Sequence, residues 1–76
     1  MRERYIPVLG VAKAETAKAF LLEPCIFDID GAEHRHMELW IPKSQIHDDD
    51  HDEIENSVKG DDIEINVSDY WLRQNT

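Results

Sequence analysis

The stretch Asp28–Glu33, "DIDGAE", carries the strongest local constraint on how this chain can fold. Its dipeptide Asp30-Gly31 favours a two-residue hairpin turn, because both residues tolerate a positive φ angle. Strand-like apolar sequence lies on either side, so we expect a long antiparallel hairpin in which residues equidistant from the turn face each other. The expected pairs are Ile29 with Ala32, Phe27 with His34, Cys25 with His36, Leu22 with Leu39, and Phe20 with Ile41.

The apolar pattern of this hairpin changes near Pro24. Beyond the proline the apolar residues stand at odd positions, from Cys25 to Ile29, whereas before it Phe20 and Leu22 stand at even positions. Because side chains alternate between the two faces of a strand, the buried face must switch here, and a bulge or bend is expected. The outer half of the hairpin would then bend away from the main core or cover a different surface.

The N-terminal part of the chain predicts a strand and a turn. Tyr5–Val11 is apolar but contains Pro7 and Gly10, which is typical of an edge strand with a bulge, so we expect it at the margin of the sheet. Ala12–Ala19 has good helix formers but is short for a helix. We interpret it as a turn near Glu15–Thr16 that joins two strands, with a short helix as the alternative.

Three further elements follow the hairpin. Residues 37–41 alternate between apolar and polar and predict a strand, and Lys43–Ile46 predicts one tight turn whose last residue returns to the core. Asp62–Val67 has the clearest alternation in the chain and predicts a half-buried strand. Ser68 is expected to cap a short helix over Asp69–Arg73.

Together these elements predict a single domain over residues 1–76 that is mainly β with a short C-terminal helix. Four or five short strands in so small a chain give a small bent antiparallel sheet or an open β-barrel. A domain of this size buries only about 60% of its unfolded surface, so we expect one small core and no cofactor. The expected core is Val8, Phe20, Leu22, Leu39, Ile41, Ile46, Ile63, Ile65, Val67 and Leu72.

The charge of the chain limits its partners. Its 17 Asp and Glu residues against 8 Lys and Arg residues give a formal net charge of −9, which argues against direct binding to nucleic acid, whose phosphates require cations. A basic protein surface is the partner that this charge favours. The single cysteine excludes an internal disulfide, and Ala17–Asp28 is too short to span a bilayer, so we expect a cytoplasmic protein that makes no membrane contact.

Residues 47–62 are the most acidic part of the chain and predict a solvated loop. One interpretation is a flexible loop held open by repulsion between like charges. The other is nucleic-acid mimicry, because extended residues repeat at about 3.3 Å, close to the spacing of phosphates along one DNA strand. The candidate partner-binding residues are Asp48, Asp49, Asp50, Asp52, Glu53, Glu55, Asp61 and Asp62 in this loop, together with Trp40.

Trp40 lies on the opposite strand face from Leu39 and Ile41. We expect it to be partly buried against the C-terminal segment, and an exposed tryptophan that anchors an interface is the alternative.

Metal binding and catalysis are weakly supported by the residues. Asp48, Asp50 and Asp52 begin an EF-hand-like count that lacks its glycine and its final glutamate, and His47 and His51 would share a face only on a helix. Cys25, His34 and His36 form the remaining candidate metal set, without an obvious fourth ligand. No nucleophile elbow or phosphate-binding glycine loop is present, so we do not expect an enzyme.

At Trp40–Ile46 the residues "WIPKSQI" resemble a motif of small, mostly uncharacterised proteins of bacteriophages and prophages. "KAFLLE" at Lys18–Glu23, "DIEINV" at Asp62–Val67 and "YWL" at Tyr70–Leu72 follow the order of that family, so the resemblance covers about residues 17–73. It implies a small β fold and a phage-like origin. The chain departs from the family in its longer hairpin and in its acidic loop.

By size and charge the chain is also similar to the small acidic anti-CRISPR proteins of phages. The expected function is therefore that of a non-catalytic phage or mobile-element protein in the host cytoplasm. It would inhibit a nucleic-acid-binding defence complex through an acidic, DNA-mimicking surface. One alternative is a structural or accessory β module that self-associates, with the outer hairpin Cys25–His36 pairing between chains. A small metal-binding protein is the other alternative.

Overall fold

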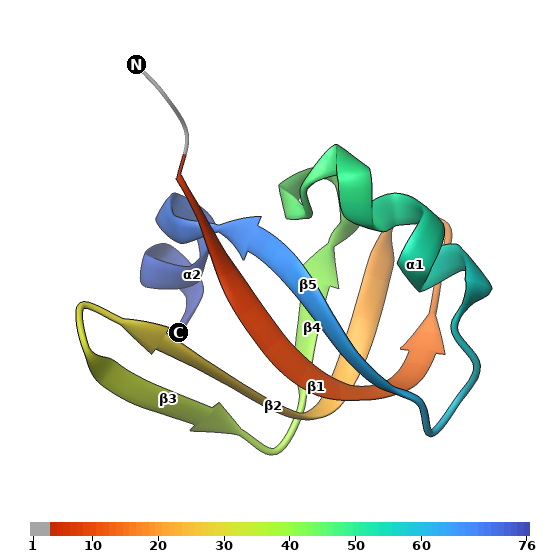
Figure 1. Cartoon of the computed structure of the whole chain (residues 1–76), viewed down its shortest axis with the longest axis horizontal. Coiled ribbons are helices and arrows are strands. Elements are labelled where there is room, and N and C mark those ends of the chain that lie inside the picture. The colour runs from red at the N-terminus through yellow and green to blue at the C-terminus, as the bar shows by residue number, and fades with distance from the viewer. Residues whose placement is uncertain (1–3) are drawn as a thin grey trace.

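The computed structural model describes residues 4–76 and contains one open antiparallel sheet with short helices packed around it (Figure 1). Its strands are β1 (Tyr5–Glu15), β2 (Ala19–Ile29), β3 (Ala32–His36), β4 (Leu39–Pro42) and β5 (Asp62–Ser68). The helical elements are η1 (Lys43–Gln45), η2 (Asp48–Asp50), α1 (His51–Asn56) and α2 (Asp69–Asn75). The sheet order is β3-β2-β1-β5, and β4 also pairs with β2. The predicted fold class is confirmed.

The hairpin has the register that the sequence predicts. Every expected pair from Ile29–Ala32 to Phe20–Ile41 is present, with β3 pairing with one half of β2 and β4 with the other half. The turn residues Asp30 and Gly31 have φ angles of 52° and 82°, the left-handed conformation for which this dipeptide is suited.

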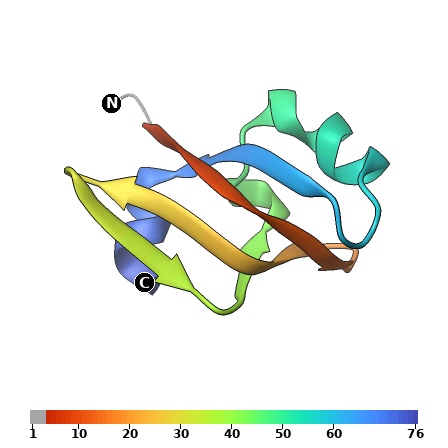
Figure 2. The same ribbon diagram turned by 60° about the horizontal axis from the view of Figure 1, so that its bottom comes forward.

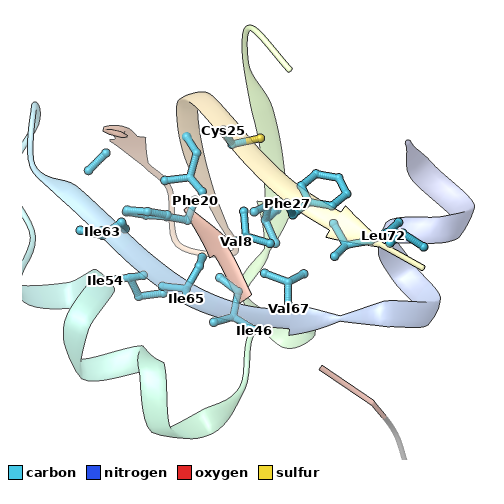
Figure 3. Close-up of a cluster of buried hydrophobic side chains, with 14 residues drawn as sticks. Val8, Phe20, Cys25, Phe27, Ile46, Ile54, Ile63, Ile65, Val67 and Leu72 are labelled. Carbon is cyan, nitrogen blue, oxygen red and sulfur yellow. The ribbon is translucent and has the colours of Figure 1, made fainter. Parts of the chain in front are cut away.

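The bend near Pro24 is also confirmed (Figure 2). The register between β1 and β2 shifts on both sides of Ala12, opposite this part of β2. Gly10 makes the close approach possible, because an added Cβ there would lie 2.7 Å from the carbonyl oxygen of Pro24. The outer half of the hairpin, however, does not leave the core: Cys25, Phe27 and Ile29 belong to the same buried cluster as Phe20 (Figure 3).

The prediction that Tyr5–Val11 forms an edge strand is wrong, because β1 lies between β2 and β5. Pro7 is tolerated there for a local reason. It stands opposite Asn66, whose N–H and C=O bond to Asp50 and His47 instead of to β1. The N–H that proline lacks would therefore point away from β5 and towards the β2 side of β1. Pairing of β1 with β2 begins only at Leu9, so no hydrogen bond of that pairing is lost at Pro7. The expected bulge next to Gly10 is present.

The core lies between the sheet and the helical elements (Figure 3). All the predicted core residues are buried except Leu39, which is partly buried against the cluster. Five residues of the core cluster were not predicted: Ala12, Cys25, Phe27, Ile29 and Ile54.

The connecting segments are mostly as expected. The turn near Glu15–Thr16 is present, with the Thr16 hydroxyl accepting a hydrogen bond from the N–H of Ala19 at 3.0 Å. The tight turn after β4 is η1, and Ile46 returns to the core. Ser68 caps α2 by accepting from the N–H of Trp71, and the helix ends at Asn75, two residues later than predicted. No helix among residues 4–76 is long and apolar enough to cross a membrane.

The prediction that residues 47–62 form a solvated loop is wrong. This part of the chain, called the acidic segment below, folds into η2 and α1. Ile54 of α1 is only 1% exposed and joins the main core. Ile54 is the one buried apolar residue of this stretch, which is a weak signal in a sequence, and its burial packs the segment against the core.

Candidate protein-binding surface

The first turn of the acidic segment is held by His47 and Asp50. His47 Nδ1 accepts from the N–H of Asp49 at 3.1 Å, and the His47 N–H donates to the carbonyl of Asn66 at 2.8 Å. The Asp50 carboxylate accepts from the backbone N–H of Asn66 at 2.8 Å and from its side-chain amide at 3.2 Å. These bonds fix η2 against the free edge of β5.

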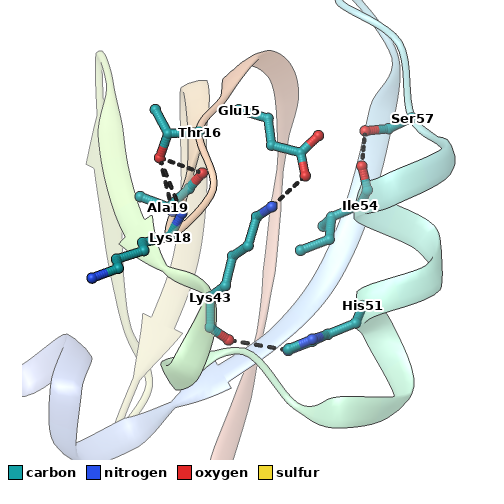
Figure 4. A network of polar contacts seen from close by, with 8 residues as sticks. All are labelled: Glu15, Thr16, Lys18, Ala19, Lys43, His51, Ile54 and Ser57. Carbon is teal, nitrogen blue, oxygen red and sulfur yellow. Dashed lines mark hydrogen bonds and ion pairs between the residues drawn. The ribbon is translucent and has the colours of Figure 1, made fainter.

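The helix α1 is fixed by His51 and Ile54 (Figure 4). His51 Nε2 lies 3.0 Å from the carbonyl oxygen of Lys43 and 3.1 Å from that of Ile46. Since both partners accept only, Nε2 must carry a hydrogen. Ile54, one turn after His51, points towards Ile65 of β5 (Figure 3). The Ser57 hydroxyl donates to the Ile54 carbonyl at 2.8 Å.

The end of the acidic segment is joined to β1. The N–H of Ala12 donates to the carbonyl of Asp61 and the N–H of Gly60 donates to the carbonyl of Ala12, both at 2.8 Å. The Asp61 carboxylate accepts from the N–H of Val58 at 2.9 Å and closes the turn. The segment is therefore hydrogen-bonded to β5 at its beginning, to the turn Lys43–Ile46 in its middle and to β1 at its end.

This arrangement divides the predicted site residues into two groups. Asp50 and Asp61 are half-buried, and their carboxylates hold the backbone. The others in the segment are exposed and remain available to a partner: Asp48, Asp49, Asp52, Glu53, Glu55 and Asp62. Trp40 is not part of this group. It is 44% exposed on β4, opposite Leu21 and on the face directed away from the core.

The proposed match to the phosphate spacing of DNA is wrong for most of the segment. It requires extended backbone, whereas η2 and α1 are helical and α1 rises only about 1.5 Å per residue. The exposed carboxylates consequently do not form an extended row along the segment.

The exposed carboxylates of the acidic segment form no ion pair with a lysine or arginine among residues 4–76, although Lys59 lies within the segment. Among residues 4–76, every ion pair of a lysine or arginine uses a carboxylate outside the segment; these pairs are Lys13–Glu23, Arg35–Glu33, Lys43–Glu15, and Arg73 with both Asp30 and Asp69. Within the segment, only His47 lies near a carboxylate, 3.6 Å from that of Asp49. The local negative potential is therefore largely uncompensated.

Between α1 and the start of β5 the surface forms a shallow groove of about 530 Å³. Four carboxylates line it, together with Asn56, Ser57 and Ile63; they are those of Asp52, Glu53, Asp61 and Asp62. The sequence alone does not indicate this groove, because its walls are brought together only when α1 packs on β5.

A second groove, of about 660 Å³, lies across the sheet and is mainly apolar. Its lining includes Leu9, which is 50% exposed, and Met37, which is 84% exposed. Arg35 lies at its β3 side and Glu64 at its β5 side. The sequence does not indicate this groove, because its lining comes from β1, β2, β3 and β5 and from residues beside them.

Two of the candidate metal residues, His34 and His36, stack on a neighbouring ring, although the Nε2 atom of His36 is buried without a hydrogen-bond partner among residues 4–76. The Phe27 ring stacks against the rings of His34 and His36, with centroid distances of 5.4 and 5.7 Å. Burial raises the pKa of the Cys25 thiol, an effect partly opposed by its hydrogen bond to the His36 backbone. A raised pKa disfavours the thiolate that both metal binding and nucleophilic attack require. Among residues 4–76, no three His, Cys, Asp or Glu side chains come together as metal ligands.

No protein-family model matches this chain, and comparisons with curated proteins and with solved structures find no match. The resemblance of Trp40–Ile46 to a phage protein motif therefore stays a prediction.

Proposed function

We propose that this protein is a non-catalytic inhibitor of phage or mobile-element origin that binds a basic surface of a host protein through its acidic segment. The observation that carries the proposal is the combination of many exposed carboxylates, which form no ion pair with a lysine or arginine among residues 4–76, with a backbone that is held to β5 at its beginning, to the turn Lys43–Ile46 in its middle and to β1 at its end. The resemblance of "WIPKSQI" to a motif of phage proteins supports the origin.

An ordered acidic surface is better suited to binding than a flexible one. A disordered loop would lose conformational entropy when it binds, whereas a segment already fixed by Asp50, His51 and Ile54 loses little. Its uncompensated charge also attracts a cationic partner at long range and accelerates association.

Nucleic-acid-binding proteins are the partner class that this chemistry favours, because they present clustered Lys and Arg side chains. A host defence complex that binds DNA or RNA is one such protein. Since the carboxylates lie on a helical segment, the proposed inhibition works by occupying the basic surface and excluding nucleic acid electrostatically. Residue-by-residue imitation of a phosphate backbone is not required.

The proposal can be tested by capture from a bacterial lysate with three baits. The first is the wild type and the second is D48N/D52N/E53Q, which removes three exposed charges of the acidic segment and leaves Asp50 and Asp61 in place. The third is the control D28N/E38Q/E64Q, which removes the same number of exposed charges elsewhere. Circular dichroism verifies that all three are folded.

We expect the wild type and the control to capture the same basic protein, and the acidic-segment variant to lose it. Added duplex DNA should release the captured protein, because both ligands occupy one surface, and capture should weaken steeply with salt. Equal capture by all three baits, or capture unaffected by DNA, would refute the proposal.

A further inference from the structure

Strand β3 is an open edge of the sheet. The order β3-β2-β1-β5 leaves β3 with β2 as its neighbour, and β4 pairs with β2 further along the same side. Figures 1 and 2 both show β3 at the outer margin of the sheet. Such an edge carries backbone N–H and C=O groups that a further strand can pair with.

The hairpin turn determines which backbone groups of β3 face outwards. In a hairpin with a two-residue turn, the flanking residues Ile29 and Ala32 form a hydrogen-bonded pair, and such pairs alternate along the ladder. The residues at positions 32, 34 and 36 therefore direct their N–H and C=O groups towards β2. Those of Glu33 and Arg35 point to the open edge.

We infer that two copies of this chain pair through β3, antiparallel, with Glu33 of each copy opposite Arg35 of the other. The occupant of the edge is a second copy because β3 is complementary to itself. Only Glu33 and Arg35 direct backbone groups outwards, so they must face each other across the interface. Pairing Glu33 with Glu33, or Arg35 with Arg35, sets like charges opposite each other, whereas the mixed register forms two attractive pairs.

The side chains of Glu33 and Arg35 are accessible for pairing with a second copy. Arg35 Nε lies 2.6 Å from the Glu33 carboxylate in the same chain, and the two side chains are 75% and 50% exposed. They lie on the same face of β3, so each can turn to the matching residue of the second copy without disturbing the core. The two-fold axis then passes beside His34, whose ring is stacked on Phe27 within its own chain.

Charge reversal at the edge tests this register. E33R leaves two arginines and no glutamate at the outward positions of β3, and R35E leaves two glutamates and no arginine there. In either variant alone both contacts across the interface become repulsive, and we expect the dissociation constant to rise about tenfold or more. When the two variants are mixed, opposite charges meet again and a heterodimer should form.

A matched control is E55R, which changes the net charge as E33R does but on the exposed side of α1. If general repulsion between acidic chains governed association, E33R and E55R would both strengthen it. The edge pairing instead predicts that E55R dimerises at least as well as the wild type and that E33R does not.

Sedimentation velocity over roughly 10 µM to 1 mM protein covers the affinities of a small interface. The expected result is a concentration-dependent dimer for the wild type, monomers for each edge variant, and a dimer for their equimolar mixture. A wild type that stays monomeric throughout, an E33R variant that dimerises as well as the wild type, or a mixture that stays monomeric would overturn the inference. The acidic segment is unchanged in the edge variants, so their capture of a basic partner tests the proposed function separately.

Discussion

The tip of the hairpin β2–β3 and the acidic segment lie at opposite ends of the molecule, and the two regions are ordered in different ways (Figure 1). The hairpin is specified by neighbours in sequence: a two-residue turn sets the register, and alternating residues select the buried face. The acidic segment is specified by distant residues, namely Asn66, the carbonyl of Lys43 and the core around Ile54. Order in a highly charged stretch thus depends on a few contacts that its own composition does not reveal.

The largest expected effect comes from removing the apolar anchor of the acidic segment. Because Ile54 is almost completely buried, Ile54→Ala should lower the free energy of unfolding by about 2–5 kcal/mol. Val58→Ala is the control, since Val58 is 65% exposed and should change stability by less than about 0.5 kcal/mol. Urea unfolding measures both values. Similar stabilities for the two variants would contradict the role of Ile54 as the anchor.

A smaller effect separates the two regions kinetically. Gly31 of the hairpin and Gly60 of the acidic segment have φ angles of 82° and 99°, and an added Cβ meets nothing within 4 Å at either position. Alanine at each should therefore cost about 1–2 kcal/mol through backbone strain alone. If the hairpin forms early, Gly31→Ala slows refolding and Gly60→Ala speeds unfolding. Stopped-flow chevrons that shift on the same arm would contradict this distinction.

The smallest expected effect concerns pH and the buried side of the hairpin. Burial raises the pKa of the Cys25 thiol in the folded protein. In the unfolded chain the thiol has its ordinary pKa of about 8.5, so as the pH rises the unfolded chain loses the thiol proton before the folded protein does. Stability should then fall as the pH rises through this range and level off above the raised pKa. Cys25→Ala should remove this part of the slope in urea unfolding at about pH 8–10. An unchanged slope would show that the thiol titrates normally.

The sequence predicts the hairpin register, the bend at Pro24, the strand 62–67 and most of the core, because each depends on local periodicity or on one special residue. The sequence does not predict the central position of β1. Pro7 indicates that one backbone hydrogen bond is missing, but it does not indicate that strands pair with the rest of β1 on both sides. The sequence fails for the acidic segment because charge outweighs the single residue Ile54. Neither groove can be predicted from the sequence, because the walls of each come from elements far apart in the chain.

The contact between the hairpin tip and α2 has an evolutionary consequence. Arg73 of α2 bonds to Asp30 in the turn at 2.9 Å and to Asp69 in its own helix at 2.7 Å, and Leu72 is buried in the same cluster as Ile29. The length of the hairpin is therefore matched to the position of the C-terminal helix. A shorter hairpin would remove the bond between Arg73 and Asp30, so we expect a change of length in one of these two distant stretches to require a compensating change in the other.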